Sequence, residues 1–427
     1  MIDPMKAEVM APVGSFASLA AAINAGADSV YFGVTQLNMR ARAADNMTID
    51  DLSEMARIAH ENNVKTYLVV NTLLYDHDIM IMKKIVDAAK KNDIDAIIAF
   101  DFACVNYCNE IKIPVHVSVQ FSISNYETVK FFAQFTNRVV LARELNLEQI
   151  KAIYQHIQDD QLTGNEGRLM EIEAFAHGAL CIAQSGRCYM SLYTDNASAN
   201  RGACRQNCRM QYKVTDVDTG KEMIIDNHYV MSAADICTID FLDKVLDAGV
   251  QVLKIEGRGR SPEYVTTVVR AYKKALKDIA DGTYTKEKTT EYYTDLEKVF
   301  NRKLSHGNFY LGKEIGAYCD VYGSRATEEK EFIGRVVHYY SKASIAEIKV
   351  DAGIIGKGTS MLIIGATTGS MEGVIDELRV DGRFAESAKK GDIITITVPD
   401  RVRVNDKLYI IKKRKKYQNE KQKISSS

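Results

Sequence analysis

The sequence has no run of about 18 uncharged apolar residues, so we expect no membrane-spanning segment. Its first residues, MIDPMKAEVMAPVG, lack the basic region and the long apolar run of a secretory signal. We therefore expect a reducing, cytoplasmic location, where clustered cysteines more often bind metal or act in catalysis than form disulfides. The net charge is −1, so contact with nucleic acid would depend on local basic patches. Tryptophan is absent and proline occurs only 5 times, but neither shortage excludes a functional class.

Several common catalytic motifs are also missing. The first predicted strand is followed by APVGSFAS rather than by GxGxxG, which argues against a dinucleotide site. The sequence contains no HExxH zinc motif and no GxSxG nucleophile elbow, and this argues against two common classes of hydrolase. His177 precedes Cys181 closely, so a Cys–His nucleophilic pair stays open as an alternative.

The order of apolar segments indicates the fold of the first part of the chain. From residue 7 onward, short apolar strands alternate with amphipathic helices, and the strands are apolar on both faces. This pattern is typical of a parallel sheet covered by helices. Nine segments qualify as strands, among them HYVMSAAD at 228–235. Eight would close a (β/α)8 TIM-like barrel, and the ninth would lie outside the barrel or cap it.

The pattern changes in the last quarter of the chain. Between residues 331 and 412, short alternating strands are separated by glycine, aspartate and asparagine, which predicts a small all-β domain, a compact barrel. The last residues are basic and polar and predict a disordered tail. We therefore expect a barrel at 1–315 with a cysteine-rich loop at 171–240, a small β-barrel domain at 325–412 and a tail at 413–427.

Cysteine is concentrated in one loop. Of 8 cysteines, four lie between residues 171 and 212 among glycine, serine and asparagine, and a fifth follows soon after; they are Cys181, Cys188, Cys204, Cys208 and Cys237. Structural zinc sites favour CxxC knuckles, whereas wide, irregular spacing favours an iron–sulfur cluster held by loops. The alternative is that some are ordinary buried cysteines. Burial is the interpretation that we favour for Cys104 and Cys108, which share one helix face, and Cys319 is not expected to bind the cluster.

Polar residues follow the predicted strands at the end where barrel enzymes carry their chemistry. Each could simply hydrogen-bond within the fold, but together they predict a polar pocket at the face where the cysteine loop leaves the barrel. Acidic residues and histidine could move protons, and cationic or amide groups could bind phosphate or carboxylate. The proton-transfer candidates are His177, Asp101, Glu144 and Glu256, and the substrate-binding candidates are Arg40, Gln120, Arg143, Lys254 and Arg258.

Two segments, HGALCIAQSGRC and SANRGACRQNC, resemble peptidase family U32, the collagenase-like peptidases. The family signature is similar to E-x-F-x-H-G-A-[LM]-C-x-x-x-S-G-x-C, which this chain matches from Glu173 to Cys188. The resemblance extends from APVGS at residues 11–15 to FNR at Asn301, and so covers about three quarters of the chain. The length and the added β domain make the chain most similar to the tRNA hydroxylation proteins of this family.

This resemblance implies a function that composition alone does not. The tRNA hydroxylation proteins install 5-hydroxyuridine at the wobble position, using prephenate or its biosynthetic route, so the anticodon loop of tRNA is the implied partner. Related proteins hydroxylate a ribosomal RNA cytidine, or act in oxygen-independent ubiquinone synthesis as paired homologous proteins. The alternatives are therefore a U32-type protease, or a cluster-bearing subunit of another hydroxylation pathway that works with a homologous partner.

The resemblance also implies a 4Fe-4S cluster. Its ligands would be Cys181, Cys188, Cys204 and Cys237. Because some relatives use both cysteines of a CX3C pair, Cys208 is the alternative ligand.

Overall fold

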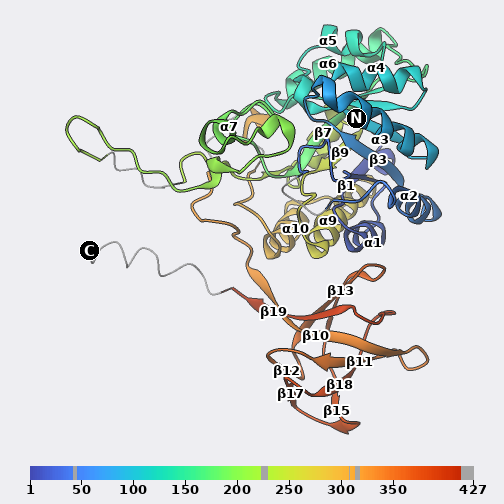
Figure 1. Cartoon of the computed structure of the whole chain (residues 1–427), viewed down its shortest axis with the longest axis vertical. Helices are drawn as coiled ribbons and strands as arrows, with labels where there is room; N and C mark the ends of the chain where they lie inside the picture. Colours follow the sequence, from blue (N-terminus) through green and yellow to red (C-terminus); the bar gives the residue numbers. More distant parts are fainter. Residues whose placement is uncertain (42–45, 223–228, 307, 313–317, 415–427) are drawn as a thin grey trace.

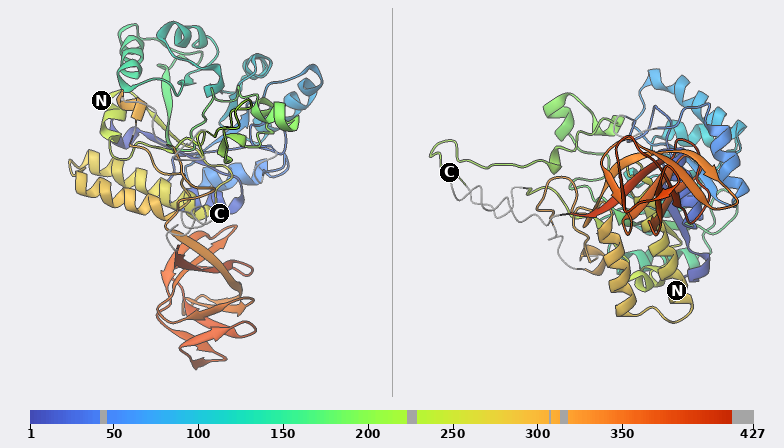
Figure 2. Two further views of the ribbon diagram at one scale, coloured as in Figure 1. Left: turned by 90° about the vertical axis from the view of Figure 1, so that its left-hand side faces the viewer. Right: turned by 90° about the horizontal axis from the view of Figure 1, so that it is seen from below.

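The structure is a computed structural model that describes residues 1–41, 46–222, 229–306, 308–312 and 318–414 (Figure 1). The chain forms a helix-covered barrel followed by a domain of β-strands, and the two lie one beyond the other along the long axis (Figures 1 and 2). None of the described helices is both long enough and apolar enough to cross a membrane. The part of the predicted basic tail from residue 415 onward lies outside the described residues.

Eight parallel strands close the barrel, as predicted. Their order is β6-β5-β4-β3-β2-β1-β9-β7, and β7 pairs again with β6 to complete the ring. At the closing pair, Val139 lies opposite Ile172. Almost every side chain of these strands is buried, which explains their continuous apolar sequences. The strands are β1 (Glu8–Pro12), β2 (Ser29–Phe32), β3 (Lys65–Val70), β4 (Ala96–Ala99), β5 (Val115–Val117), β6 (Arg138–Val140), β7 (Glu171–Gly178) and β9 (Val252–Ile255).

Amphipathic helices cover the outside of the ring. The helix at 52–61 buries Leu52, Met55, Ala56 and Ala59 on one face. Capping residues define several helix starts; for example, the Ser15 hydroxyl accepts a hydrogen bond from the Ser18 N–H at 3.1 Å. The helices are α1 (Phe16–Asn24), α2 (Leu52–Glu61), α3 (Ile79–Lys91), α4 (Phe102–Glu110), α5 (Tyr126–Phe132), α6 (Leu147–Asp159), α7 (Met190–Asp195), α8 (Leu242–Asp247), α9 (Pro262–Ala280) and α10 (Lys286–Lys298).

A ninth strand lies outside the barrel, but not where the sequence predicts it. The expected strand at 228–235 is wrong, because the described residues 229–235 form turns and isolated bridges. Their backbone pairs with the chain after α10 instead: the Asp235 N–H donates to the Lys303 carbonyl at 3.0 Å. The strand itself, β8 (Ile236–Cys237), runs antiparallel to the end of β7.

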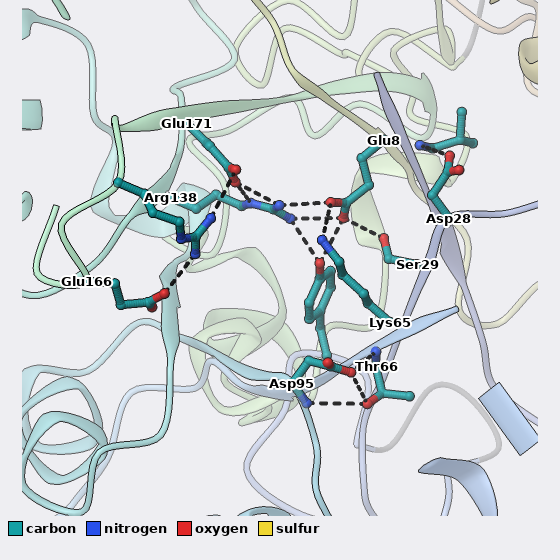
Figure 3. A network of polar contacts seen from close by, with 12 residues as sticks. Glu8, Asp28, Ser29, Lys65, Thr66, Asp95, Arg138, Glu166 and Glu171 are labelled. Carbon is teal, nitrogen blue, oxygen red and sulfur yellow. Dashed lines mark hydrogen bonds and ion pairs between the residues drawn. The ribbon is translucent and has the colours of Figure 1, made fainter. Parts of the chain in front are cut away.

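A buried ion network joins the amino-terminal ends of the strands (Figure 3). Arg138 at the start of β6 binds Glu171 at the start of β7, with 2.8 Å between Nε and Oε2. The same guanidinium binds Glu8 at the start of β1. This network lies at the end of the barrel opposite to the one where the predicted site residues follow the strands.

The second domain is all-β, as predicted. An eight-stranded antiparallel sheet has the order β14-β13-β19-β10-β11-β18-β15-β16, and β12 pairs with β17. Within the described residues no pairing joins β14 to β16, so hydrogen bonds do not close this sheet into a ring. The strands are β10 (Glu328–Tyr340), β11 (Ile345–Val350), β12 (Ile354–Gly356), β13 (Ser360–Gly365), β14 (Gly369–Val374), β15 (Leu378–Val380), β16 (Arg383–Phe384), β17 (Ser387–Lys389), β18 (Ile393–Thr397) and β19 (Lys407–Lys413).

The two domains touch through β14 and α1. Gly369 has φ +72°, and a Cβ atom there would lie 2.7 Å from the backbone nitrogen of Ala21. The Asn24 amide donates to the Thr368 carbonyl at 3.2 Å beside this contact. A cleft of about 880 Å³ opens between α9, α10 and the β domain, and no predicted site residue lines it.

Candidate functional site

The cysteine loop folds over the carboxyl ends of the barrel strands. At two glycines in this loop a side chain would collide with the barrel residues beneath. A Cβ on Gly186 would lie 2.8 Å from Cγ of Gln120, and a Cβ on Gly202 would lie 2.3 Å from the carbonyl oxygen of Asn38. Both glycines also have positive φ, +79° and +80°. The loop therefore packs directly on the mouth of the barrel.

Four of the five candidate cysteines form one group within this loop. Cys181 is exposed, whereas Cys188, Cys204 and Cys208 are half-buried. Burial raises the pKa of the Cys208 thiol, Arg209 lowers it, and the other three cysteines of the group raise it further. The other three thiols therefore lie within electrostatic range of Cys208. The Gln206 N–H also points to Sγ of Cys204, 3.4 Å away.

Cys237 lies outside this group of four cysteines. It is fully buried in β8 directly opposite His177 of β7, and burial raises the pKa of its thiol to about 12. The structure therefore groups Cys208, rather than Cys237, with the other three loop cysteines. The prediction of burial is confirmed for Cys104 and Cys108, both of which are fully buried in α4.

The donor set suits a cluster better than a single ion. Among the described residues, no three His, Cys, Asp or Glu side chains are placed to hold one metal ion together. In a 4Fe-4S cluster each cysteine binds a different iron, so the sulfurs stand farther apart than around one ion. Four grouped thiols on irregular backbone, with an N–H directed at one sulfur, fit that requirement.

An ion pair joins the loop after β2 to the loop after β9 at the mouth of the barrel. Nη2 of Arg40 lies 3.0 Å from Oε1 of Glu256, which follows β9. Burial raises the pKa of Glu256, but the charges of Arg40, Arg260 and Arg143 and the hydrogen bond from Arg40 together lower it to about 2. Glu256 raises the pKa of Arg40, with further contributions from Cys181 and Cys204. Glu256 is therefore ionised and paired at neutral pH.

A second ion pair lies inside the barrel. Lys254 of β9 binds Glu173 of β7, with 2.6 Å between Nζ and Oε1, and the two side chains are 7% and 0% exposed. Oε2 of Glu173 has no hydrogen-bond partner among the described residues. Burial lowers the pKa of Lys254, although Glu173 opposes that shift. Sequence reasoning did not assign Glu173 to the site, although a carboxylate at an inward position of an apolar strand is a usable signal.

Two arginines of the pocket have unsatisfied nitrogens. Arg258 is buried, its Nη1 has no partner among the described residues, and burial lowers its pKa to about 10. Arg143 donates to the Ala179 carbonyl at 2.9 Å, but its buried Nε has no such partner. Burying an unpaired guanidinium is costly, so this arrangement suits an anionic ligand.

The remaining candidates differ in their surroundings. His177 is buried and its Nδ1 has no partner among the described residues; burial lowers its pKa to about 3, so it is neutral at neutral pH. Gln120 is part of a polar network and bonds to Asn71 at 2.9 Å. Asp101 caps α4, with its two oxygens occupied by backbone N–H groups at 2.9 and 3.0 Å. Glu144 is exposed at the surface.

The structure gives no support to a nucleophile–base pair. In the parts of the chain that the structure describes, no histidine is hydrogen-bonded to a serine, threonine or cysteine. A buried neutral imidazole at position 177 could act as a base, but no hydrogen bond joins it to the Cys181 thiol within the described residues.

Sequence comparison assigns the family. The profile of Peptidase family U32 matches residues 14–317. The chain belongs to this family. A protein named collagenase from Porphyromonas gingivalis is 49% identical to this U32 protein over 95% of this chain and 98% of its own. The tRNA hydroxylation protein P1 of Bacillus subtilis is 30% identical over 78% of each chain. A solved U32 peptidase is 14% identical with a TM-score of 0.32, covering 40% of this chain and 70% of its own.

Proposed function

We propose that this U32 protein is an RNA-modifying enzyme that hydroxylates C5 of the wobble uridine in tRNA. The observation that carries the proposal is the position of four grouped cysteines over buried cationic side chains at the mouth of the barrel. That mouth is where barrel enzymes carry out chemistry. The similarity to a tRNA hydroxylation protein over 78% of each chain supports the same function.

A peptidase is the competing function, because relatives named collagenase are more similar in sequence. Covalent peptide hydrolysis needs an activated nucleophile, and metal-dependent hydrolysis needs an ion with an open coordination position. The described residues contain neither a nucleophile bonded to histidine nor three ligands placed around one ion. These observations favour modification of RNA over proteolysis.

The cofactor of the proposed enzyme is a 4Fe-4S cluster bound by Cys181, Cys188, Cys204 and Cys208. C5 of uridine does not react directly with a hydroxyl donor, and the cluster would supply electron transfer for that step. The chain would position the cluster through Gly186 and Gly202, which let the loop approach the barrel.

The proposed co-substrate is a carboxylate such as prephenate. Arg258 and Arg143 would bind it, because a planar guanidinium pairs bidentately with a carboxylate and both have nitrogens without partners among the described residues. Neutral His177 offers Nδ1, which has no partner among the described residues, as a further hydrogen-bonding atom. The uridine must leave its stack to reach this pocket, which is easiest in a single-stranded anticodon loop. A homologous protein partner and a cytoplasmic location belong to the same proposal.

The decisive experiment uses a strain from which the encoding gene is deleted. Total tRNA would be digested and its wobble nucleosides measured by mass spectrometry, before and after complementation with wild-type protein. We expect 5-hydroxyuridine to disappear on deletion and to return on complementation. Unchanged 5-hydroxyuridine, together with gelatin cleavage by the purified protein, would replace this proposal with the peptidase function.

A further inference from the structure

The short helix α7 presents two tyrosines to solvent next to the cysteine group. Tyr189 precedes the helix and Tyr193 lies within it, one helical turn apart, so the two share a face. Their exposed fractions are 70% and 92%. Neither hydroxyl bonds to another described residue, and such exposure is unusual for a large ring that contributes nothing to the core.

Hydrogen bonds join this helix to the segment between Cys204 and Cys208. The side chain of Asn207, which lies between Cys204 and Cys208 in sequence, donates to the Thr194 hydroxyl at 2.7 Å. Asn207 also contacts Ser191 Oγ at 3.1 Å and donates to an oxygen of Asp195 at 3.1 Å. A surface ordered in advance loses less entropy when it binds a partner.

The segment that carries the two rings is rich in cationic residues, although the chain as a whole carries −1. Between residues 181 and 213 the only acidic side chain is Asp195. The cationic side chains in this segment are Arg187, Arg201, Arg205, Arg209 and Lys213. Arg201 is paired with Asp78 and Lys213 with Glu222. Arg187 and Arg205 are exposed, so their charge is available to a partner. The surface therefore suits a polyanion that also presents flat apolar faces.

We infer that Tyr189 and Tyr193 stack against unpaired bases of an RNA loop and thereby hold that loop over the barrel mouth. Single-stranded RNA fits this surface because its bases stack on aromatic side chains while its phosphates bind arginine. A paired duplex offers no free base faces to the two rings. This inference rests on the proposed function, because it names the part of the chain that would bind the RNA.

Fluorescence anisotropy tests the inference without any catalytic readout. The probes are a labelled RNA hairpin with an unpaired, uridine-containing loop and a fully paired duplex of similar length. Full-length protein, purified anaerobically, would be titrated as wild type, Tyr193→Ala and the double variant Tyr189→Ala/Tyr193→Ala. Loss of one stacked base contact weakens binding by about tenfold. We expect the hairpin to bind Tyr193→Ala about tenfold more weakly and the double variant more weakly still, while duplex binding is unchanged.

Two controls separate stacking from general damage. Tyr189→Phe/Tyr193→Phe keeps both rings and should bind the hairpin like wild type. Phe384→Ala removes an equally exposed ring from the β domain and should change nothing. Iron content is measured for each variant. Tyr193→Ala is the variant least expected to disturb the fold, because the Tyr193 side chain is 92% exposed.

The outcomes are distinguishable. Hairpin binding by the alanine variants that equals wild type overturns the inference alone. Wild-type protein that binds neither RNA overturns the proposed function. Alanine variants that convert a dimer into a monomer in sedimentation, with RNA binding unchanged, overturn the inference in favour of a contact between copies of this chain.

Discussion

Arg138 of β6 reaches across the inside of the barrel to Glu8 of β1, and two strands separate them in the ring (Figure 3). Nη1 and Nη2 lie 2.9 and 2.8 Å from the two carboxylate oxygens, a bidentate contact. Burial by itself would raise the pKa of Glu8, but the charge and hydrogen bonds of Arg138 and a bond from Ser29 lower it to about 2.

This depressed pKa predicts how stability depends on pH. The ordinary pKa of the group is 4.5, so the folded state holds the proton less tightly than the unfolded state. The stabilisation is fully present above pH 4.5 and is lost as pH falls from there to about 2. We expect Glu8→Gln to lower the free energy of unfolding at pH 7 by about 3–5 kcal/mol, because Arg138 is left partly unpaired in the core. Urea unfolding followed by circular dichroism between pH 7 and pH 2 measures both effects.

The matched control is Glu54→Gln, which removes a carboxylate that pairs with Arg57 on the surface of α2. Solvent screens that pair, so the loss of stability should be much smaller. Equal losses for Glu8→Gln and Glu54→Gln would contradict the structural role assigned to the barrel network.

The barrel was predictable because burial dominates it. Strands such as AIIA at 96–99 are apolar on both faces, and that pattern survives in the sequence as a continuous run. The error at 228–235 has a physical cause: the apolar residues there belong to a segment whose backbone pairs with 303–305 and 318, not with the barrel strands. Contacts between residues this far apart leave no periodic signal.

The sequence predicted which strand ends carry the candidate residues, but not how those residues pair. Strand ends placed Arg40, Arg258 and Glu256 at one mouth, because parallel strands end at the same edge. Spacing could not distinguish Cys208 from Cys237, since that choice depends on how the loop folds back. Nor could it show that one oxygen of Asp101 caps α4 while the other accepts from the Leu74 N–H, because the two donors come from separate segments.

The cysteine group predicts a definite pattern of iron loss. Alanine at Cys181, Cys188, Cys204 or Cys208 should each strongly reduce iron and sulfide in anaerobically purified protein, because each removes one cluster ligand. Cys237→Ala should keep the iron and lose only about 1 kcal/mol of stability, the usual size of a core truncation. Iron retained by Cys208→Ala but lost by Cys237→Ala would reverse the assignment of the fourth ligand.

Replacing Arg258 should raise the stability of the protein and abolish its activity. Arg258→Met removes a buried guanidinium whose Nη1 has no partner among the described residues, so the free energy of unfolding should rise by about 1–4 kcal/mol. The same substitution should abolish 5-hydroxyuridine in complemented cells, since the anion would lose its partner. Arg379→Met on the β domain, the control, should change neither quantity. A destabilised Arg258→Met that still hydroxylates tRNA would show that Arg258 serves the fold.

The pair of Lys254 and Glu173 predicts a coupling that a single substitution cannot reveal. Glu173→Gln leaves the Lys254 ammonium buried without a counter-charge, so the free energy of unfolding should fall by about 3–5 kcal/mol. Adding Lys254→Met removes the unpaired charge, so the double variant should recover most of the lost free energy of unfolding. Urea unfolding of the wild type, both single variants and the double variant completes the cycle. Strictly additive losses would mean that the two groups do not interact energetically, and their contact of 2.6 Å would then have no energetic consequence in the folded protein.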